Sequence, residues 1–168
     1  RVLELGLEVG RQMVEERAFD DALRLLRAAR RAAEETGEST NGKISYLLGE
    51  SHIQAGEVEL GRTRLEEAIA EASDDLSRAR YQVQLNEVEM ARLNVRRLEQ
   101  GARRALGWLG DGLERAGWRE SSRVAAELAR FVWWRNVAVP EPARGEERER
   151  YRLLSYIYEQ LSLVAVFR

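Results

Sequence analysis

Apolar residues recur three and four positions apart along almost the whole chain, as at Leu3 and Leu7 and at Leu23 and Leu26. This spacing places apolar side chains on one face of an α-helix. No segment shows the sustained alternation of apolar and polar residues that is typical of a half-buried strand. The pattern therefore predicts an all-α protein.

The helical pattern also repeats itself along the chain. A shift of 39 residues aligns small or apolar residues of one unit with those of the next, pairing Leu5 with Ile44, Gly10 with Gly49, Ala22 with Gly61 and Leu26 with Leu65. A further shift of 40 residues places Leu93, Leu98 and Gly101 in a third unit. Each unit is predicted to hold two helices around a tight turn, at residues 16–18, 55–57 and 96–97. One unit cannot bury its own apolar stripe, so the units are expected to stack.

The second helix of each unit has a small residue where it must approach the first helix closely, at Ala22, Gly61 and Gly101. A small residue, a leucine and an alanine follow one another at one-turn intervals in the first two units, and the preceding helices contain Gly10 and Gly49. This series resembles the tetratricopeptide repeat over residues 1–117. The resemblance implies an α-solenoid of about four stacked antiparallel helical hairpins. The third unit departs from it, with Glu89 at the glycine position.

Residues 118–168 differ from the three units. We expect a long helix over 120–139, a linker with Pro140 and Pro142, and a strongly apolar helix over 151–167, which together form a truncated repeat. This arrangement is similar to the repeat region of bacterial multidomain signalling ATPases, of the kind linked to adenylate or guanylate cyclase or protein kinase domains. Because the chain starts at Arg1 and stops within an apolar pattern, we expect a piece of a longer, cytoplasmic protein.

The amino-acid composition excludes several classes of site and partner. The 168 residues include no cysteine and one histidine, so disulfides, zinc–thiolate sites and multi-histidine metal sites are excluded. The 27 basic and 29 acidic side chains give a formal charge of −2, which argues against binding to nucleic acid or an anionic membrane surface. No apolar run approaches the roughly 20 residues of a membrane span. We therefore expect no cofactor, no metal, no nucleic acid and no membrane.

Residues 37–43 match the G-x-x-x-x-G-K pattern of a phosphate-binding loop, but Ile44 stands where Ser or Thr would hold Mg²⁺. The segment also follows a predicted helix, whereas a phosphate loop follows a strand. We interpret it as a loop between units, in which Gly37 ends one helix and Ser39, Thr40 or Asn41 caps the next. The chain is accordingly predicted to bind no ATP and to be no enzyme.

Other side chains that suggest chemistry have simpler interpretations. His52 is expected to be a partly buried, satisfied residue of the core. Neighbouring carboxylates such as Glu66 and Glu67 point about 100° apart on a helix, so we expect solvated faces, with Asp74 and Asp75 favouring a helix start. The arginine runs favour surface ion pairs over RNA contacts. The aromatic residues are expected to pack in the core rather than to stack on bases: Phe131, Trp133, Trp134, Tyr151, Tyr156 and Tyr158.

The predicted function is display of a surface for a protein or peptide partner, or for neighbouring domains of a longer chain. By resemblance to the groove positions of the family, the candidate contact residues are Arg11, Glu15, Lys43, Tyr46, Glu50, Gln54, Asn86, Met90 and Asn94. Two alternatives remain open at this point. The segment regulates a linked ATPase or cyclase domain within one chain, or it senses a small effector.

The apolar helix over 151–167 predicts self-association. Two apolar stripes and further apolar residues surround it, and such a helix is normally buried on more than one side. We expect one stripe to remain uncovered and to form a homodimer contact through Leu153, Ile157 and Val164.

Overall fold

The computed structural model describes residues 2–110 and 144–166, and every element in these ranges is an α-helix. This confirms the predicted fold class. The elements are α1 (Val2–Glu15), α2 (Phe19–Thr36), α3 (Lys43–Gln54), α4 (Val58–Glu71), α5 (Asp75–Ala91), α6 (Val95–Trp108) and α8 (Gly145–Val166). The helix expected over 120–139, the linker with Pro140 and Pro142, and the residues Phe131, Trp133 and Trp134 lie outside the described residues.

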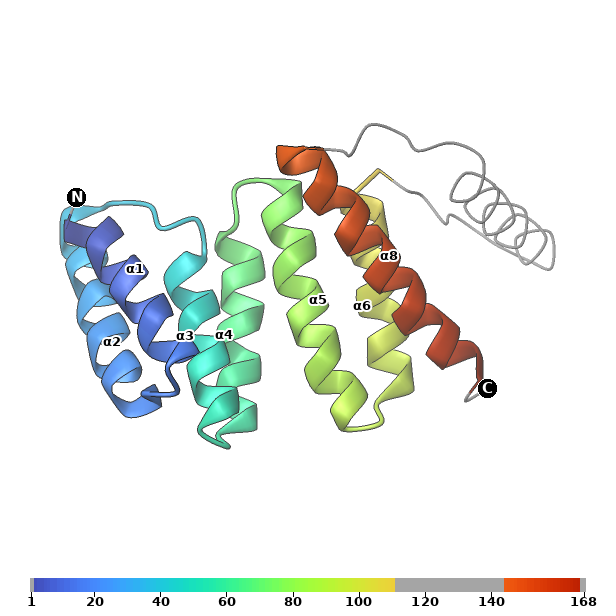
Figure 1. Ribbon diagram of the computed structural model, residues 1–168, viewed down its shortest axis with the longest axis horizontal. Helices are drawn as coiled ribbons and strands as arrows, with labels where there is room; N and C mark the ends of the chain where they lie inside the picture. Colours follow the sequence, from blue (N-terminus) through green and yellow to red (C-terminus); the bar gives the residue numbers. More distant parts are fainter. Residues whose placement is uncertain (1, 111–143, 167–168) are drawn as a thin grey trace.

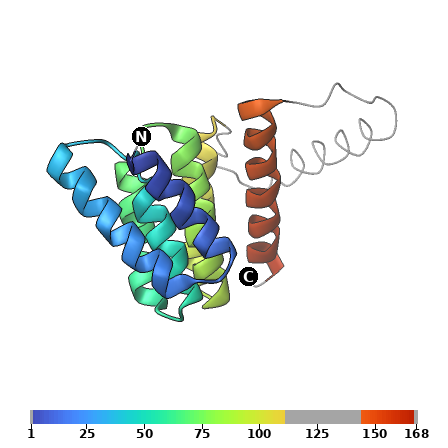
Figure 2. The same ribbon diagram turned by 60° about the vertical axis from the view of Figure 1, so that its left-hand side comes forward.

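The helices form three antiparallel hairpins, α1–α2, α3–α4 and α5–α6, which stack side by side (Figure 1). The first helices α1, α3 and α5 lie in one layer and the second helices α2, α4 and α6 in the other, as the turned view also shows (Figure 2). Helix α8 packs on α6 and α5 and runs parallel to α5. It thus takes the place of the first helix of a fourth hairpin.

The three hairpin turns share one backbone conformation. Arg17, Gly56 and Leu93 have φ values of 63°, 85° and 56°, in the left-handed region. The next residue donates its backbone N–H to the carbonyl oxygen five residues earlier, at 2.8 Å in all three turns: Ala18 to Met13, Glu57 to His52 and Asn94 to Glu89. These equivalent turn residues therefore define which positions of one hairpin correspond to which positions of the next.

This correspondence corrects the register of the third hairpin. The left-handed residues lie 39 positions apart between the first two hairpins, as predicted, but 37 apart between the second and third. The third turn is accordingly at residues 92–94, and α6 starts at Val95 where Asn94 accepts a hydrogen bond from the backbone of Arg97 at 3.4 Å. The shift of 40 and the turn expected at 96–97 were wrong by about one helical turn.

In each of the first two hairpins a glycine lies where the two helices come closest, here called the seam of the hairpin. This confirms the close approach predicted from the small residues. A Cβ atom on Gly10 would lie 2.7 Å from Leu26 Cδ2, and one on Gly49 would lie 2.9 Å from Leu65 Cγ. In the corrected register Asn86 occupies the equivalent position in α5. Asn86 is fully buried and sits at hydrogen-bond distance from the amides of Gln82 and Gln160, each at 2.9 Å. The third seam is therefore polar where the first two are apolar.

The loop between α2 and α3 forms hydrogen bonds with residues at the start of α5. Gly37 ends α2 in the left-handed conformation, as expected. None of Ser39, Thr40 and Asn41 caps α3, whose N-cap is Gly42 without a side-chain hydrogen bond. The Asn41 side chain instead accepts the backbone N–H of Ser73 and donates to Asp74 Oδ2 at 3.1 Å. Asn41 therefore links the loop before α3 to the loop before α5 rather than capping α3.

We expect Asp74→Ala to lower the free energy of unfolding by about 1 kcal/mol, because it removes the N-cap of α5. Asp74 Oδ1 accepts the backbone N–H of Ser77 at 2.7 Å, and this hydrogen bond lowers the pKa of the carboxyl group. The contribution is present above the unfolded-state pKa and is lost as the pH falls through the folded-state pKa. Urea unfolding at neutral and acidic pH measures this. The control Asp75→Ala removes a first-turn carboxylate and its pair with Arg78 but leaves the N-cap in place, so it should cost less at neutral pH.

Candidate functional site: the face formed by the first helices

The candidate site is the surface of α1, α3, α5 and α8, here called the first-helix face. In the corrected register Arg11, Glu50 and Glu87 occupy equivalent positions on α1, α3 and α5. Arg11 is exposed and pairs with Glu8 within its own helix at 2.7 Å. The two glutamates are half-buried, so the centre of this face carries two partly desolvated carboxylates.

Glu50 is held by an aromatic pair between α3 and α5. The Tyr46 hydroxyl donates to Glu50 Oε1 at 2.6 Å, and the Tyr46 ring stacks on Tyr81 with the ring centroids 4.9 Å apart. Burial raises the pKa of Glu50, and the nearby carboxylates of Glu87 and Glu15 raise it further. Burial, together with the adjacent Glu50, also raises the pKa of Tyr46, so Tyr46 stays a neutral donor. Glu50 is therefore positioned by packing and not by a cation.

Glu87 has an analogous partner from α8. The Tyr156 hydroxyl donates to Glu87 Oε1 at 2.8 Å, and Gln84 Nε2 donates to Glu87 Oε2 at 3.0 Å. The hydrogen bond to Glu87 is the main reason that the pKa of Tyr156 is raised to about 12. Both oxygens of Glu87 thus accept hydrogen bonds from neutral donors, which orient the carboxylate.

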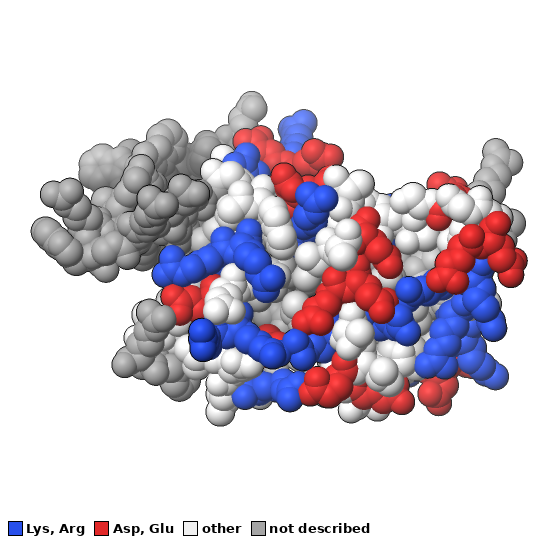
Figure 3. Space-filling view, turned by 180° about the vertical axis from the view of Figure 1, so that it is seen from behind, with Lys and Arg blue, Asp and Glu red and all other residues white. Residues whose placement is uncertain are grey.

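The two faces of the solenoid differ in whether their glutamates form ion pairs with arginines. On the second helices, arginines and glutamates are interleaved (Figure 3): Arg30 pairs with Glu67 at 2.9 Å between neighbouring hairpins, and Arg62 pairs with Glu66 at 2.8 Å within α4. Glu67, expected to be solvated, is half-buried in this network. Within the described residues neither Glu50 nor Glu87 forms an ion pair with an arginine or lysine. These two carboxylates of the first-helix face therefore differ from Glu66 and Glu67 on α4, which pair with arginines.

Four predicted contact residues on α1 and α3 have the exposure that a partner contact requires: Arg11, Glu15, Lys43 and Gln54. Tyr46 and Glu50 are half-buried between them. In the corrected register Glu15 of the first hairpin and Gln54 of the second occupy equivalent positions. Lys43 of the second hairpin and Arg80 of the third are equivalent in the same way. Whether any of these side chains contacts a partner stays a prediction.

The predicted contact residues on α5 need correction. Asn86 is 0% exposed, so no partner can reach it in this structure. Met90 lines a pocket near the α5–α6 turn, and Asn94 caps α6. These positions followed from the shift of 40; the shift of 37 that the turns define places Val83, Glu87 and Ala91 there instead.

Sequence reasoning missed Glu87, Arg80 and Tyr156. One signal was available for the first two, because Asn94 before an apolar helix pattern is a typical N-cap and would have placed the turn correctly. No local signal pointed to Tyr156, whose partner Glu87 lies 69 residues earlier in the chain.

The predicted self-association residues are buried within the chain. Leu153, Ile157 and Val164 are 8%, 0% and 4% exposed. Leu153 and Ile157 pack against small residues of α5 and α6, among them Ala79, Ala102 and Ala105. The stripe expected at a dimer contact is therefore the stripe that docks α8, which corrects the expectation for these three residues.

The remaining candidate chemistry has structural roles. Residues 37–42 connect two helices, Lys43 begins α3, and Ile44 is a core residue with 1% exposure, so the metal-binding hydroxyl of a phosphate loop has no counterpart. His52 is 3% exposed and its Nδ1 lies 2.5 Å from Glu57 Oε2 across the hairpin turn, as expected for a satisfied histidine. Among the described residues no group of three His, Asp or Glu side chains is placed to hold a metal ion.

None of the helices in the described ranges has both the length and the apolar character needed to cross a membrane.

Comparison with known proteins supports the repeat assignment. The tetratricopeptide repeat family model matches residues 13–83, from the end of α1 into α5. No curated protein and no solved structure matches the chain. Tetratricopeptide repeats generally mediate protein–protein interaction and are typically non-catalytic scaffolds. The chain thus carries a tetratricopeptide-like repeat region within an α-solenoid of stacked helical hairpins.

Proposed function

We propose that the chain is a protein-interaction scaffold whose first-helix face binds a segment of a partner that carries arginine or lysine side chains. One observation carries the proposal. Glu50 and Glu87 are half-buried carboxylates without an arginine or lysine partner among the described residues, whereas Glu66 and Glu67 on the second helix α4 pair with arginines. A cation from a partner would complete charge-assisted hydrogen bonds to them.

The neighbouring side chains suit the same role. Tyr46 and Tyr156 fix the two carboxylates through their hydroxyl groups, so little side-chain entropy remains to be lost on binding. Their rings add apolar contact area for the aliphatic part of an arginine or lysine. Exposed Glu15 lies close enough to raise the pKa of Glu50 and extends the acidic surface onto α1.

The likeness to the repeat regions of bacterial multidomain signalling ATPases supports a wider setting for this scaffold. In that setting the chain is part of a larger cytoplasmic signalling protein, and the basic segment belongs to another protein or to a neighbouring domain. The binding chemistry of the first-helix face is the same in both cases.

A titration of the isotope-labelled protein with two short synthetic peptides tests the proposal by NMR. One peptide combines alanine with arginine, and the other replaces each arginine with glutamate. We expect the arginine peptide to shift amide signals of α3 and α5 around Glu50 and Glu87. The double variant Glu50→Gln with Glu87→Gln should weaken its binding about tenfold or more, because it removes both charges while keeping acceptors for the tyrosines.

Glu66→Gln is the matched control, because Glu66 lies on the second-helix face and pairs with Arg62. It should leave the affinity for the arginine peptide unchanged. Affinity should also fall on acidification, starting above the ordinary range of a glutamate because the pKa of Glu50 is raised. Equal binding of both peptides, or full affinity in the double variant, would contradict the proposal.

A further inference from the structure

Helix α8 is held against the solenoid by a contact that changes along its length. In its first half, Leu153 and Ile157 pack among small and apolar residues of α5 and α6. Arg150 adds a hydrogen bond to the carbonyl oxygen of Leu109, just after α6, at 2.6 Å. Burial of apolar surface and this hydrogen bond therefore fix the first half of α8.

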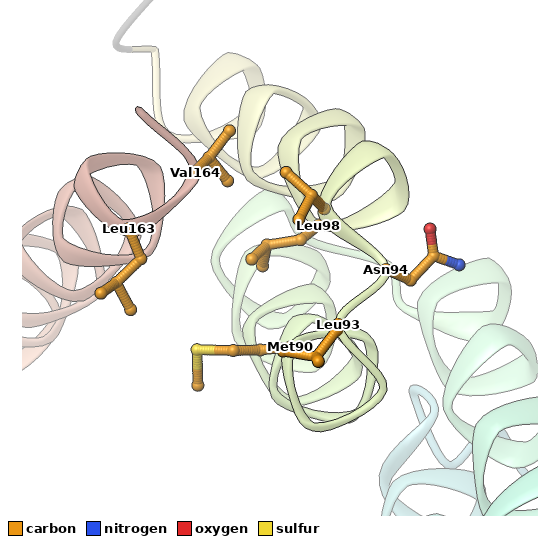
Figure 4. Close-up of a pocket in the computed structure, with 7 residues that line it drawn as sticks. Met90, Leu93, Asn94, Leu98, Leu163 and Val164 are labelled. Carbon is orange, nitrogen blue, oxygen red and sulfur yellow. The ribbon is translucent and has the colours of Figure 1, made fainter. Parts of the chain in front are cut away.

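The second half of α8 meets the solenoid less completely. Three buried amides, those of Gln82, Asn86 and Gln160, lie in its contact with α5, and Gln82 Oε1 has no hydrogen-bond partner within the described residues. Beyond them a pocket of about 30 Å³ lies between Leu163 and Val164 of α8 and the α5–α6 turn (Figure 4). A buried unpaired polar atom and an unfilled pocket both reduce the free energy gained by docking. The contact of α8 is therefore weaker than a fully apolar, close-packed contact would be.

Docked α8 contributes two side chains to the first-helix face. The Tyr156 hydroxyl donates to Glu87, and Glu149 Oε1 lies 2.5 Å from Nη2 of Arg80. Arg80 belongs to this face, because it occupies the position on α5 that the exposed Lys43 has on α3. Glu87 follows Arg80 by two helical turns and thus lies on the same side of α5. Docking of α8 therefore supplies one partner to Arg80 and one to Glu87.

Arg80 lies within electrostatic range of the acidic centre of this face. Burial raises the pKa of Tyr46, and the positive charge of Arg80 partly opposes that rise. The Tyr46 hydroxyl is the donor to Glu50, so the guanidinium group acts on the group that holds this carboxylate. The Arg80 side chain is 42% exposed, so it can adopt other rotamers once Glu149 has moved away. Released from Glu149, its charge is attracted to Glu50 and Glu87.

We propose that α8 is a latch that sets the affinity of the first-helix face for a basic segment. With α8 docked, Glu149 retains Arg80 and Tyr156 orients Glu87, so the carboxylates are open to a cation of the partner. With α8 released, Arg80 turns toward Glu87 and takes the place of that cation. This regulation rests on the function proposed for the first-helix face. Because coupling between two events is reciprocal, binding of a basic segment strengthens the docking of α8.

The titration with the arginine peptide measures the effect of the latch. Glu149→Gln breaks the ion pair with Arg80 and leaves the apolar contact of α8 in place. It should weaken binding about threefold, since the freed arginine competes for the carboxylates. Arg80→Gln should instead strengthen binding by a similar factor.

Glu146→Gln is the matched control, because it removes an exposed carboxylate from the first turn of α8 that forms no ion pair within the described residues. It should change the affinity much less than Glu149→Gln does. In the Arg80→Gln background the two substitutions should have equal and small effects, because Glu149 then has no arginine to retain. An effect of Glu149→Gln that persists in full without Arg80 would overturn the proposal.

Ile157→Glu tests the release of α8, because it places a charge within the apolar contact of this helix. It should weaken binding of the arginine peptide about tenfold, and adding Arg80→Gln should recover about threefold of that loss. In the original chain the arginine peptide should slow hydrogen exchange of the α8 amides, and the glutamate peptide should not.

The outcomes separate the latch from the function on which it rests. If the original chain, Glu149→Gln and Ile157→Glu bind the arginine peptide equally well, the latch is overturned and the proposed function stands. If the original chain does not distinguish the arginine peptide from the glutamate peptide, the proposed function fails and the latch with it. Circular dichroism checks that Ile157→Glu keeps its helices, and if it unfolds, Glu149→Gln and Arg80→Gln decide alone.

Discussion

Gly61→Leu should lower the free energy of unfolding by about 3 kcal/mol, because it forces apart the two helices of the second hairpin. A Cβ atom at this position would lie 2.5 Å from Ile53 Cγ1, 2.8 Å from the carbonyl oxygen of Gly49 and 3.0 Å from the backbone nitrogen of Ile53. Two of these three atoms belong to the backbone of α3. The helix as a whole must therefore move, since no side-chain rotation relieves the contact.

Gly107→Ala is the matched control for Gly61→Leu. Gly107 also lies within a helix, α6, but a Cβ atom there would meet no atom within 4 Å. Alanine should therefore raise stability by about 0.5–1 kcal/mol through its better helix propensity. Urea unfolding of both variants by circular dichroism measures the difference. Two similarly mild effects would show that α3 and α4 do not approach each other as closely as the structure places them.

The first two hairpins could be predicted because close contacts between helices require small residues at regular positions in the sequence. Gly10 and Gly49 lie against leucines 39 positions apart, and Ala22 and Gly61 face their partner helices at the same interval. A residue with a side chain larger than alanine does not fit such a contact. The spacing of small residues therefore carries direct information on which helix faces meet.

The third hairpin shows why the same reasoning failed there. The shift of 40 depended on aligning Gly101 with Gly61, but Gly101 is small for a different reason: a Cβ atom on it would collide with the buried amide of Asn86. The residue that marks the turn is Leu93, where a glycine would have been recognisable. A polar seam and a strained leucine thus replaced the two signals on which the register relied.

Part of the candidate site could be predicted from the sequence. Tyr46, Glu50 and Glu15 were placed on α1 and α3 because those helices follow the predicted register. Glu87 was lost with the register error, and its hydrogen bond from Tyr156 depends on where α8 returns to the solenoid. Local periodicity determines which face of a helix is apolar, but it does not determine which distant helix covers that face.

Ile157→Glu should detach α8 from the solenoid and lower the free energy of unfolding by about 4 kcal/mol. Ile157 is 0% exposed and packs among Ala79, Ala102, Ala105 and Leu106. Within that apolar contact a glutamate has no partner to offset the cost of burying its charge. Thermal unfolding and hydrogen exchange of the α8 amides measure the loss. Tyr151 on the same helix is 58% exposed, so Tyr151→Glu should be mild by comparison.

The same variant distinguishes intramolecular docking of α8 from a dimer contact. If Ile157 docks α8 within its own chain, Ile157→Glu uncovers apolar surface on α5 and α6, and light scattering should show more self-association. If Ile157 instead met a second copy, the variant would self-associate less and its α8 amides would stay protected from exchange. The burial of Leu153, Ile157 and Val164 against α5 and α6 leads us to expect the first result. Tyr151 and Leu163, which remain exposed on α8, are then the positions where a substitution to glutamate should reduce any self-association of the intact chain.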